Sequence, residues 1–145
     1  KYKCKIIFEP GRAIIGNAGL IVTRITYIKK SPKKNFVILD AGMNDLMRPA
    51  LYNAKHEILP SNKNKKIYNK QFEFVGPCCE SSDKFLNSNK YQKIKENDFL
   101  LIMNTGAYGM SLASNYCFRS KPSEILIDKN KIKLIRKKQN INNLV

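Results

Sequence analysis

The chain has 145 residues, of which 43% are hydrophobic, and it carries a formal net charge of +16 at pH 7. That length and composition suit a single globular domain and exclude a disordered tail. No apolar run approaches the roughly 20 residues that a membrane-spanning helix needs, and no signal peptide is visible. Because Lys1 stands first and an apolar segment follows at once, we expect a fragment cut within an element of structure.

The positive charge alone would suit a nucleic-acid-binding module, and that alternative stays open at this point. Most of the 27 basic residues are lysines, however, whereas recognition of phosphates and bases favours arginine. Many of these lysines lie in turn-like stretches at 29–34, 63–70 and 84–95. This distribution is typical of a solvated basic surface.

The four cysteines, Cys4, Cys78, Cys79 and Cys117, form no Cys-x-x-Cys pair. The single histidine, His56, is not near any of them in the sequence. We therefore expect no metal site. Nothing in the sequence indicates secretion, so reduced thiols in a cytoplasmic protein are expected.

The predicted secondary structure consists of short strands separated by turns. Apolar runs predicted as strands lie, in chain order, at 4–8, 20–28, 36–39, 57–59, 72–75, 99–103, 124–127 and 131–135. Short helices are predicted at 12–18, 48–55 and 110–116. The polar stretches 61–70 and 81–97 are predicted as loops, the second with room for one helical turn. This pattern is typical of an all-β barrel or sandwich.

Two of these elements allow a more detailed prediction. Residues 20–28 alternate, which places Ile21, Thr23, Ile25 and Tyr27 on one side of a strand. The last two strands are joined by Asp128-Lys129-Asn130, so we expect a β-hairpin at the carboxyl end.

Two polar segments in the first half follow apolar runs and can bind anions. In 9–12, Gly11 allows close approach of a ligand to the backbone and Arg12 can bind an anion. In 44–52, Arg48 and Tyr52 are four residues apart, so a helical turn places both on one face, where they could hold a carboxylate. The alternatives are a strand-to-helix turn with a surface Arg, and a solvated Arg beside a half-buried Tyr.

Two further segments lie in the second half. In 76–81, Cys79 stands beside Glu80, which suits a thiol that keeps a proton and delivers it, and does not suit a thiolate nucleophile. Cys78 is interpreted as a small residue packed at a turn. In 104–109, the glycines around Tyr108 are expected to free the backbone to direct that ring toward a ligand, the alternative being a tight turn with a packed aromatic ring.

The order of these segments, Glu-Pro-Gly-Arg, Asn-Asp-Leu-Met-Arg-Pro-Ala-Leu-Tyr, Gly-Pro-x-Cys-Glu-Ser and Gly-Ala-Tyr-Gly, resembles the diaminopimelate decarboxylases from Phe8 to about Arg136. These are alanine-racemase-like enzymes that use pyridoxal 5'-phosphate. The resemblance implies a mainly β fold: residues 19–145 form the C-terminal β-barrel or sandwich domain. Residues 1–18 are then the last strand and helix of a (β/α)₈ barrel that is otherwise missing.

The resemblance also implies the roles of the residues around the cofactor. Glu9 corresponds to the acid that pairs with the pyridine nitrogen and keeps the ring protonated. Pro10, Gly11 and Arg12 correspond to the phosphate-binding turn. Tyr108 corresponds to a tyrosine that contacts both cofactor and substrate.

For the substrate, the resemblance implies loss of CO2 from the D-centre of meso-2,6-diaminopimelate, giving L-lysine. Arg48 and Tyr52 would hold the far, L-configured carboxylate, Glu80 would receive the far amino group, and Arg12 would also contact substrate. Cys79 would be the proton donor. The family implies a cytoplasmic homodimer in which the Cys-Glu segment reaches into the partner's site.

One departure from the family and one competing family remain. The family's Schiff-base lysine, barrel histidine and Gly-rich phosphate loop lie upstream, and this chain holds none of them, so we expect it to be inactive alone. Ornithine and arginine decarboxylases would share the first and third segments. They usually have Asp after the Cys, and their substrates offer no far carboxylate to Arg48.

Overall fold

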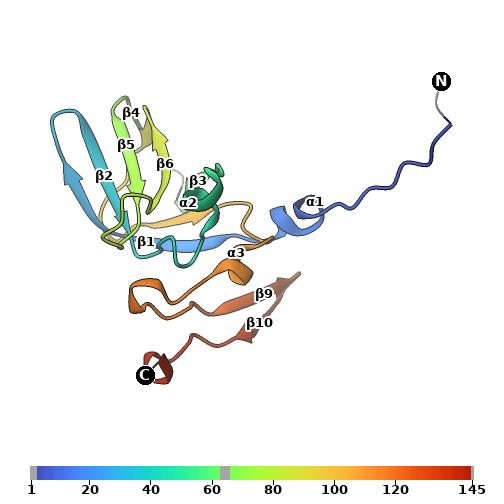
Figure 1. Ribbon diagram of the computed structural model, residues 1–145. Coiled ribbons are helices and arrows are strands. Elements are labelled where there is room, and N and C mark those ends of the chain that lie inside the picture. The colour runs from blue at the N-terminus through green and yellow to red at the C-terminus, as the bar shows by residue number, and fades with distance from the viewer. Residues whose placement is uncertain (1–2, 63–65, 145) are drawn as a thin grey trace.

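The computed structural model describes residues 3–62 and 66–144, with side chains described to residue 142. Its main body is one six-stranded sheet with the strand order β3-β8-β1-β2-β5-β6 (Figure 1). The strands of this sheet are β1 (Ile21–Lys30), β2 (Lys34–Leu39), β3 (Ile58–Pro60), β5 (Gln71–Val75), β6 (Lys84–Ser88) and β8 (Phe99–Ile102). β2 and β5 run parallel, whereas the other neighbours are antiparallel.

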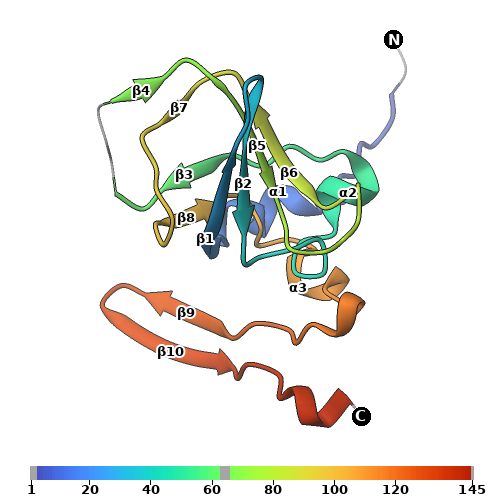
Figure 2. The same ribbon diagram turned by 90° about the vertical axis from the view of Figure 1, so that its left-hand side faces the viewer.

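The remaining elements are short. Two two-stranded sheets pair β4 (Ile67–Tyr68) with β7 (Tyr91–Gln92) and β9 (Glu124–Asp128) with β10 (Lys131–Arg136). The helices are α1 (Arg12–Ile15), α2 (Arg48–Tyr52), α3 (Gly109–Leu112) and the 3₁₀ turns η1 (Gly16–Ala18), η2 (Tyr116–Phe118) and η3 (Ile141–Leu144). Figures 1 and 2 both show the β9–β10 hairpin lying apart from the six-stranded sheet, with α3 nearer to that sheet.

The hydrophobic core lies against one face of the six-stranded sheet. Its fully buried members are alternate residues of neighbouring strands together with one loop residue: Ile25, Val37, Leu39, Leu46, Phe74, Leu100 and Ile102. The ring centroids of Phe74 and Tyr91 lie 4.7 Å apart, so the ring of Tyr91 in β7 closes one side of this core.

The predicted mainly β fold is confirmed, as are most of its elements. The chain forms helical turns at 12–18, the helix of 48–55 over its first five residues, and the C-terminal hairpin. The hairpin turn places Lys129 at a φ of 52°. The helix α2 ends where Asn53 adopts a left-handed conformation with a φ of 52°, which stops the helical hydrogen bonding early.

Three predictions about the strands were wrong. Residues 4–8 form no strand, because the described part of the chain offers them no partner, and Phe8 is 82% exposed. The predicted loops contain strands: β4 lies in 61–70, of which 63–65 fall outside the described residues, and β6 and β7 lie in 81–97. β6 exists because Leu86 pairs with Phe74 of β5 and Phe85 is buried in the core, although polar residues surround both.

The third error concerns the faces of β1. The register against β2 shifts between Ile25 and Tyr27, so the alternation reverses. Tyr27 is therefore 54% exposed, and Ile28 packs against the core instead.

Among the described helices, none is both long and apolar enough to cross a membrane.

Candidate active site

Arg48 is held between two tyrosine rings. It begins α2, and its guanidinium carbon lies 5.7 Å from the ring centroid of Tyr52 and 5.5 Å from that of Tyr108. The four-residue spacing thus brings Arg48 and Tyr52 together, as predicted. Cation–π attraction orients a planar guanidinium over such rings and still leaves its in-plane donors available.

The cluster of Arg48, Tyr52 and Tyr108, called here the Arg48 cluster, lacks an acceptor. Nε of Arg48 is buried and makes no hydrogen bond to any described residue. A buried donor of this kind is unfavourable unless an acceptor satisfies it. Tyr52 is 62% exposed and Tyr108 is 47% exposed, so the cluster is open on one side. A carboxylate entering there would give the guanidinium a charge-assisted partner.

Tyr108 reaches this position through its own backbone, contrary to the prediction that neighbouring glycines supply the conformational freedom. Tyr108 has a φ of 64° and Asn104 a φ of 61°, whereas no described glycine has a positive φ. Gly106 is needed for close approach instead, because a Cβ there would collide with the carbonyl oxygen of Ile15. The left-handed tyrosine is a strained conformation, and such residues often occur at functional sites.

The turn before Tyr108 is hydrogen-bonded to both ends of η1. The amide of Thr105 donates to the carbonyl oxygen of Gly19 at 2.9 Å, and that of Gly106 donates to the carbonyl oxygen of Gly16 at 3.0 Å. This contact brings Gly11, just before α1, beside Tyr108, where a Cβ on Gly11 would lie 2.7 Å from the tyrosine oxygen. The first two predicted segments and the fourth therefore meet in space.

Glu9 and Arg12 flank Gly11 and are both exposed. Neither side chain makes a hydrogen bond or an ion pair with the residues that the structure describes. The carboxylate of Glu9 suits a protonated ring nitrogen. The guanidinium of Arg12 and the backbone at Gly11, which has no side chain in the way, suit a phosphate. These residues therefore fit a pyridoxal phosphate group.

The Cys79–Glu80 loop, residues 76–83, is organised by Asp83. This carboxylate is 2% exposed and accepts one backbone hydrogen bond on each oxygen, from Met43 at 2.7 Å and from Cys78 at 2.8 Å. The carboxyl group also packs so closely beneath Gly76 that a side chain at Gly76 would collide with it. Asp83 thus fixes the backbone on which Cys79 stands.

The two cysteines of this loop have different environments. Cys79 is exposed, whereas Cys78 is half-buried. Burial is the main cause that raises the pKa of the Cys78 thiol to about 12, and its hydrogen bond with the Cys117 thiol adds to the effect. This supports the interpretation of Cys78 as a packed turn residue and leaves Cys79 as the accessible thiol.

Glu80 contacts the segment after α3. The Tyr116 hydroxyl donates to a Glu80 carboxylate oxygen at 3.3 Å, and the charge of Glu80 is the main cause that raises the pKa of Tyr116. Across the described residues, no hydrogen bond or ion pair joins Cys79 or Glu80 to the Arg48 cluster. The structure therefore assembles one half of the predicted site and leaves the other on a separate exposed loop.

Sequence reasoning missed Asp83 as the support of this loop and Tyr116 as a partner of Glu80. Asp83 follows Glu80 by three residues, a spacing without any chemical signature. Its partner Met43 is 40 residues away along the chain, so only the folded structure reveals the contact.

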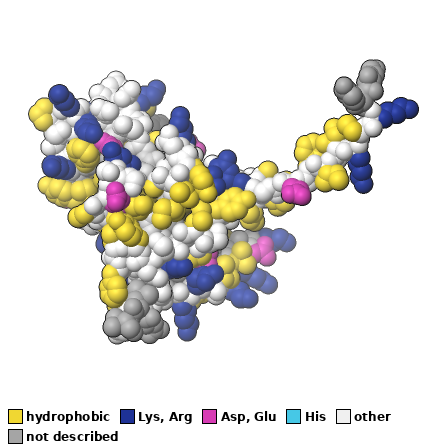
Figure 3. All heavy atoms as spheres, viewed as in Figure 1, with side chains coloured by type: hydrophobic (Ala, Val, Ile, Leu, Met, Phe, Trp, Pro, Cys, Tyr) yellow, Lys and Arg dark blue, Asp and Glu magenta, His cyan; other side chains and the backbone are white. Residues whose placement is uncertain are grey.

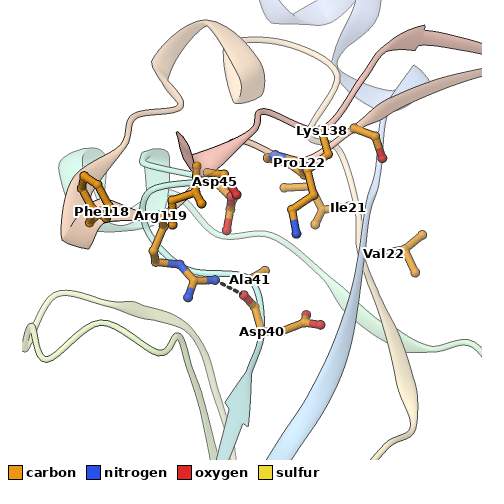
Figure 4. A pocket seen from close by; sticks show the side chains of 12 residues that line it. Ile21, Val22, Asp40, Ala41, Asp45, Phe118, Arg119, Pro122 and Lys138 are labelled. Carbon is orange, nitrogen blue, oxygen red and sulfur yellow. Dashed lines mark hydrogen bonds between the residues drawn. The ribbon is translucent and has the colours of Figure 1, made fainter. Parts of the chain in front are cut away.

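A cavity of about 490 Å³ lies elsewhere, between β1 and the chain after η2 (Figure 4). Arg119 crosses it, donating from Nε to the Asn44 side chain at 3.1 Å and from Nη2 to the Asp40 carbonyl oxygen at 2.5 Å. Burial is the main cause that raises the pKa of Asp45 at its edge. None of the predicted site residues lines this cavity. Arg119 serves to fix the loop after β2.

Comparison with known proteins places the chain in a family. Residues 12–106 match the model of the pyridoxal-dependent decarboxylase C-terminal sheet domain. This chain belongs to the pyridoxal-dependent decarboxylases. It is 40% identical over 145 residues to diaminopimelate decarboxylase of Aquifex aeolicus and 46% identical over 139 residues to that of Neisseria meningitidis serogroup B. It covers 99% and 96% of itself in these comparisons but 34% and 33% of the relatives, so it spans about a third of their length.

Solved structures give the same result. The match with diaminopimelate decarboxylase from M. jannaschii covers 94% of the present chain and 31% of the M. jannaschii chain, with a TM-score of 0.88 and 38% identity. The match with the Helicobacter pylori enzyme complexed with L-lysine covers 94% of the present chain and 33% of the H. pylori chain, with a TM-score of 0.85 and 43% identity. A lysine/ornithine decarboxylase from Vibrio vulnificus, at 21% identity and a TM-score of 0.67, shares the fold alone.

Proposed function

We propose that this chain is the C-terminal part of a pyridoxal-phosphate-dependent decarboxylase that converts meso-2,6-diaminopimelate to L-lysine and CO2. The observation that carries this proposal is the Arg48 cluster, whose buried Nε has no acceptor. A substrate with a second carboxylate, remote from the one that leaves, supplies that acceptor. The relatives named diaminopimelate decarboxylase, 40% and 46% identical to this chain, support the same substrate.

The substrate's far end is recognised by two charges of opposite sign. Arg48 and Tyr52 hold the L-configured carboxylate, and Glu80 receives the amino group on the same carbon. Arg12 and Tyr108 contact the substrate nearer the reacting centre. Because binding at the far end fixes the molecule at two points, the D-centre is held in one orientation.

Pyridoxal 5'-phosphate would be held by Glu9, Pro10, Gly11, Arg12 and Tyr108. When bound, it supplies an electron sink for the pair of electrons left by CO2. Arg12 and the backbone at Gly11 would meet its phosphate, and Glu9 would keep its ring nitrogen protonated. The side chains of Glu9 and Arg12 have no partner among the described residues, which supports this assignment.

Cys79 supplies the proton that replaces CO2 on the reacting carbon. Its thiol is exposed on a loop whose backbone is fixed by Asp83, so it can be directed at a substrate without rearrangement of the loop.

The exposed position of this loop supports a homodimer in which Cys79 and Glu80 complete the partner's site. We also propose that residues 1–18 end a (β/α)₈ barrel and that 19–145 form the β-domain. The solvent exposure of the apolar segment 4–8 supports this division. The chain by itself would be inactive. Its four free cysteines suit a cytoplasmic location.

Two other functions are less well supported. Ornithine and arginine lack a second carboxylate, so their decarboxylases would leave the buried Nε of Arg48 without an anion. A nucleic-acid-binding module would need its basic side chains gathered on one surface. Figure 3 shows Lys and Arg side chains dispersed among apolar and acidic ones on the visible face.

The test is to join this chain to the upstream two thirds of the Aquifex aeolicus relative and to supply pyridoxal phosphate and meso-diaminopimelate. We call this protein the reconstituted enzyme and expect it to form lysine, whereas the chain alone forms none. The intact Aquifex enzyme is the positive control. If that control forms lysine and the soluble, cofactor-loaded reconstituted enzyme does not, the proposed function is wrong.

A further inference from the structure

His56 is a buried histidine that no part of the proposed reaction uses. It is 2% exposed and lies between α2, which carries Arg48, and β3. Its Nδ1 lies 2.9 Å from the carbonyl oxygen of Met103, the residue directly after β8. His56 therefore connects two segments that lie 47 positions apart in the sequence.

The chemistry of this contact fixes the direction of the hydrogen bond. A carbonyl oxygen can only accept, so Nδ1 carries the hydrogen and donates it to Met103. Nε2 is buried and has no partner among the described residues. Burial of an imidazole with one nitrogen unsatisfied is an unfavourable way to gain a single hydrogen bond. Stability alone therefore does not explain why a histidine occupies this position.

The two segments that His56 joins carry the two sides of the Arg48 cluster. On one side, Arg48 and Tyr52 lie on α2, and the chain reaches His56 four residues after Tyr52. On the other side, Met103 leads through the left-handed Asn104 to Tyr108. The hydrogen bond from His56 thus joins the two segments, called here the two arms, that carry the residues around the guanidinium: α2 to His56, and Met103 to Tyr108.

Backbone pairing alone leaves this junction incompletely fixed. The amide of Met103 donates to the carbonyl oxygen of Glu57 at 2.9 Å, which extends the β3–β8 pairing by one bond. Beyond that bond, no backbone hydrogen bond between described residues joins the segment that leads back to α2 with the one that leads to Tyr108. His56 adds a side-chain hydrogen bond where they separate and so limits rotation of one arm against the other.

We propose that His56 is a positioning residue: through Met103 it sets the spacing between Arg48 and Tyr108, and thereby the affinity of the site for the substrate's far carboxylate. This inference rests on the proposed function, because it assigns that carboxylate to the Arg48 cluster. His56 itself touches neither substrate nor cofactor. Its effect is on selectivity for a carboxylate and does not extend to the binding of amino groups.

The test compares two ligands that differ in this carboxylate alone. L-Lysine keeps the far carboxylate, and cadaverine is the same diamine without it. Their affinities for the cofactor-loaded reconstituted enzyme are measured by calorimetry. The ratio of the affinity for L-lysine to that for cadaverine reports how strongly the site binds the carboxylate. We expect His56→Phe, which keeps a ring but loses the donor, to lower the affinity for L-lysine about tenfold and to leave that for cadaverine unchanged.

A pair of amides separates the hydrogen bond from packing. The amide nitrogen of Asn can occupy the place of Nδ1, whereas that of Gln extends to the place of Nε2. His56→Asn should therefore restore the selectivity for L-lysine, and His56→Gln should not. If Asn and Gln give the same ratio, or if every variant including His56→Asn fails to fold, the inference is wrong, since His56 would then serve packing alone.

Arg48→Gln distinguishes failure of this inference from failure of the proposed function. If Arg48→Gln leaves the lysine-to-cadaverine ratio unchanged, the cluster does not hold the carboxylate, and the proposed function is wrong. If Arg48→Gln lowers the ratio and His56→Phe does not, the carboxylate site stands and only the role of His56 is overturned.

Discussion

The Arg48 cluster and the Cys79–Glu80 loop are built in opposite ways. In the Arg48 cluster, two aromatic rings enclose a cation, and its buried Nε lacks an acceptor. In the loop, the carboxylate of Asp83 fixes the backbone from beneath and leaves Cys79 exposed. A binding group gains from a preformed, desolvated surrounding, whereas a group that must meet a second surface gains from a rigid support and a free side chain.

The loop side of this comparison is tested most strongly by Cys79→Ala. Loss of a positioned proton donor should lower kcat of the reconstituted enzyme about 10²- to 10⁴-fold, with KM for diaminopimelate little changed. Lysine formation is measured at saturating and limiting substrate. Cys78→Ala, one residue away and half-buried, is the matched control and should keep near-normal kcat. The assignment would be wrong if the two variants exchanged these phenotypes.

The Arg48 side is tested by Arg48→Ala. Because hydrogen bonds to charged groups contribute about 1.5–3 kcal/mol, kcat/KM for diaminopimelate should fall about 10- to 100-fold, chiefly through KM. Steady-state kinetics separates the two parameters. Arg24→Ala is the control, because the Arg24 side chain is half-exposed on β1 and its ion pair within the described part of the chain is a long one, with Asp40 at 3.9 Å. Equal effects of the two substitutions would remove the distinction between a binding arginine and a surface one.

Asp83→Asn tests whether the loop depends on support from beneath. An amide can accept only one of the two backbone hydrogen bonds, so the free energy of unfolding should fall by about 1–3 kcal/mol in urea titrations of the reconstituted enzyme. We also expect kcat to fall, since Cys79 loses its fixed support. Asp98→Asn is the control: its amide oxygen can still accept the single backbone hydrogen bond from Lys95, so stability should change less and kcat not at all. Unchanged kcat in Asp83→Asn would show that the loop needs no such support.

Glu73 on β5 provides the smallest effect and lies outside both regions. Its buried carboxylate accepts a hydrogen bond from Lys34 and pairs with Lys84 at 3.2 Å, and the Lys34 hydrogen bond is the main cause that lowers the pKa of Glu73. A lowered folded-state pKa stabilises the fold above the unfolded-state pKa, and this contribution is lost as pH falls through the folded-state value.

Glu73→Gln should therefore lower the free energy of unfolding by about 1 kcal/mol near pH 7. The difference from the parent should shrink as the pH falls below about 4. Urea unfolding of the reconstituted enzyme at several pH values measures it, with Asp128→Asn in the exposed hairpin as control. A change in KM or kcat would mean that the two regions are not independent of the rest of the sheet.

The sequence determined the local pieces of this protein. Apolar runs and turn residues predicted the fold class and the C-terminal hairpin, because strand formation there depends on near neighbours. The four-residue spacing predicted the contact of Arg48 with Tyr52 for the same reason. The order of the four motifs along the chain indicated the family.

The tertiary structure decided what depends on distant partners. β6 and β7 exist because β5 and β4 pair with them, and the reversal of Tyr27 and Ile28 follows from the register against β2. The supports of the two regions are contacts of this kind: Asp83 with Met43 across 40 positions, and His56 with Met103 across 47. No local spacing encodes such hydrogen bonds, since the carboxylate and the imidazole find their partners only when the strands have packed.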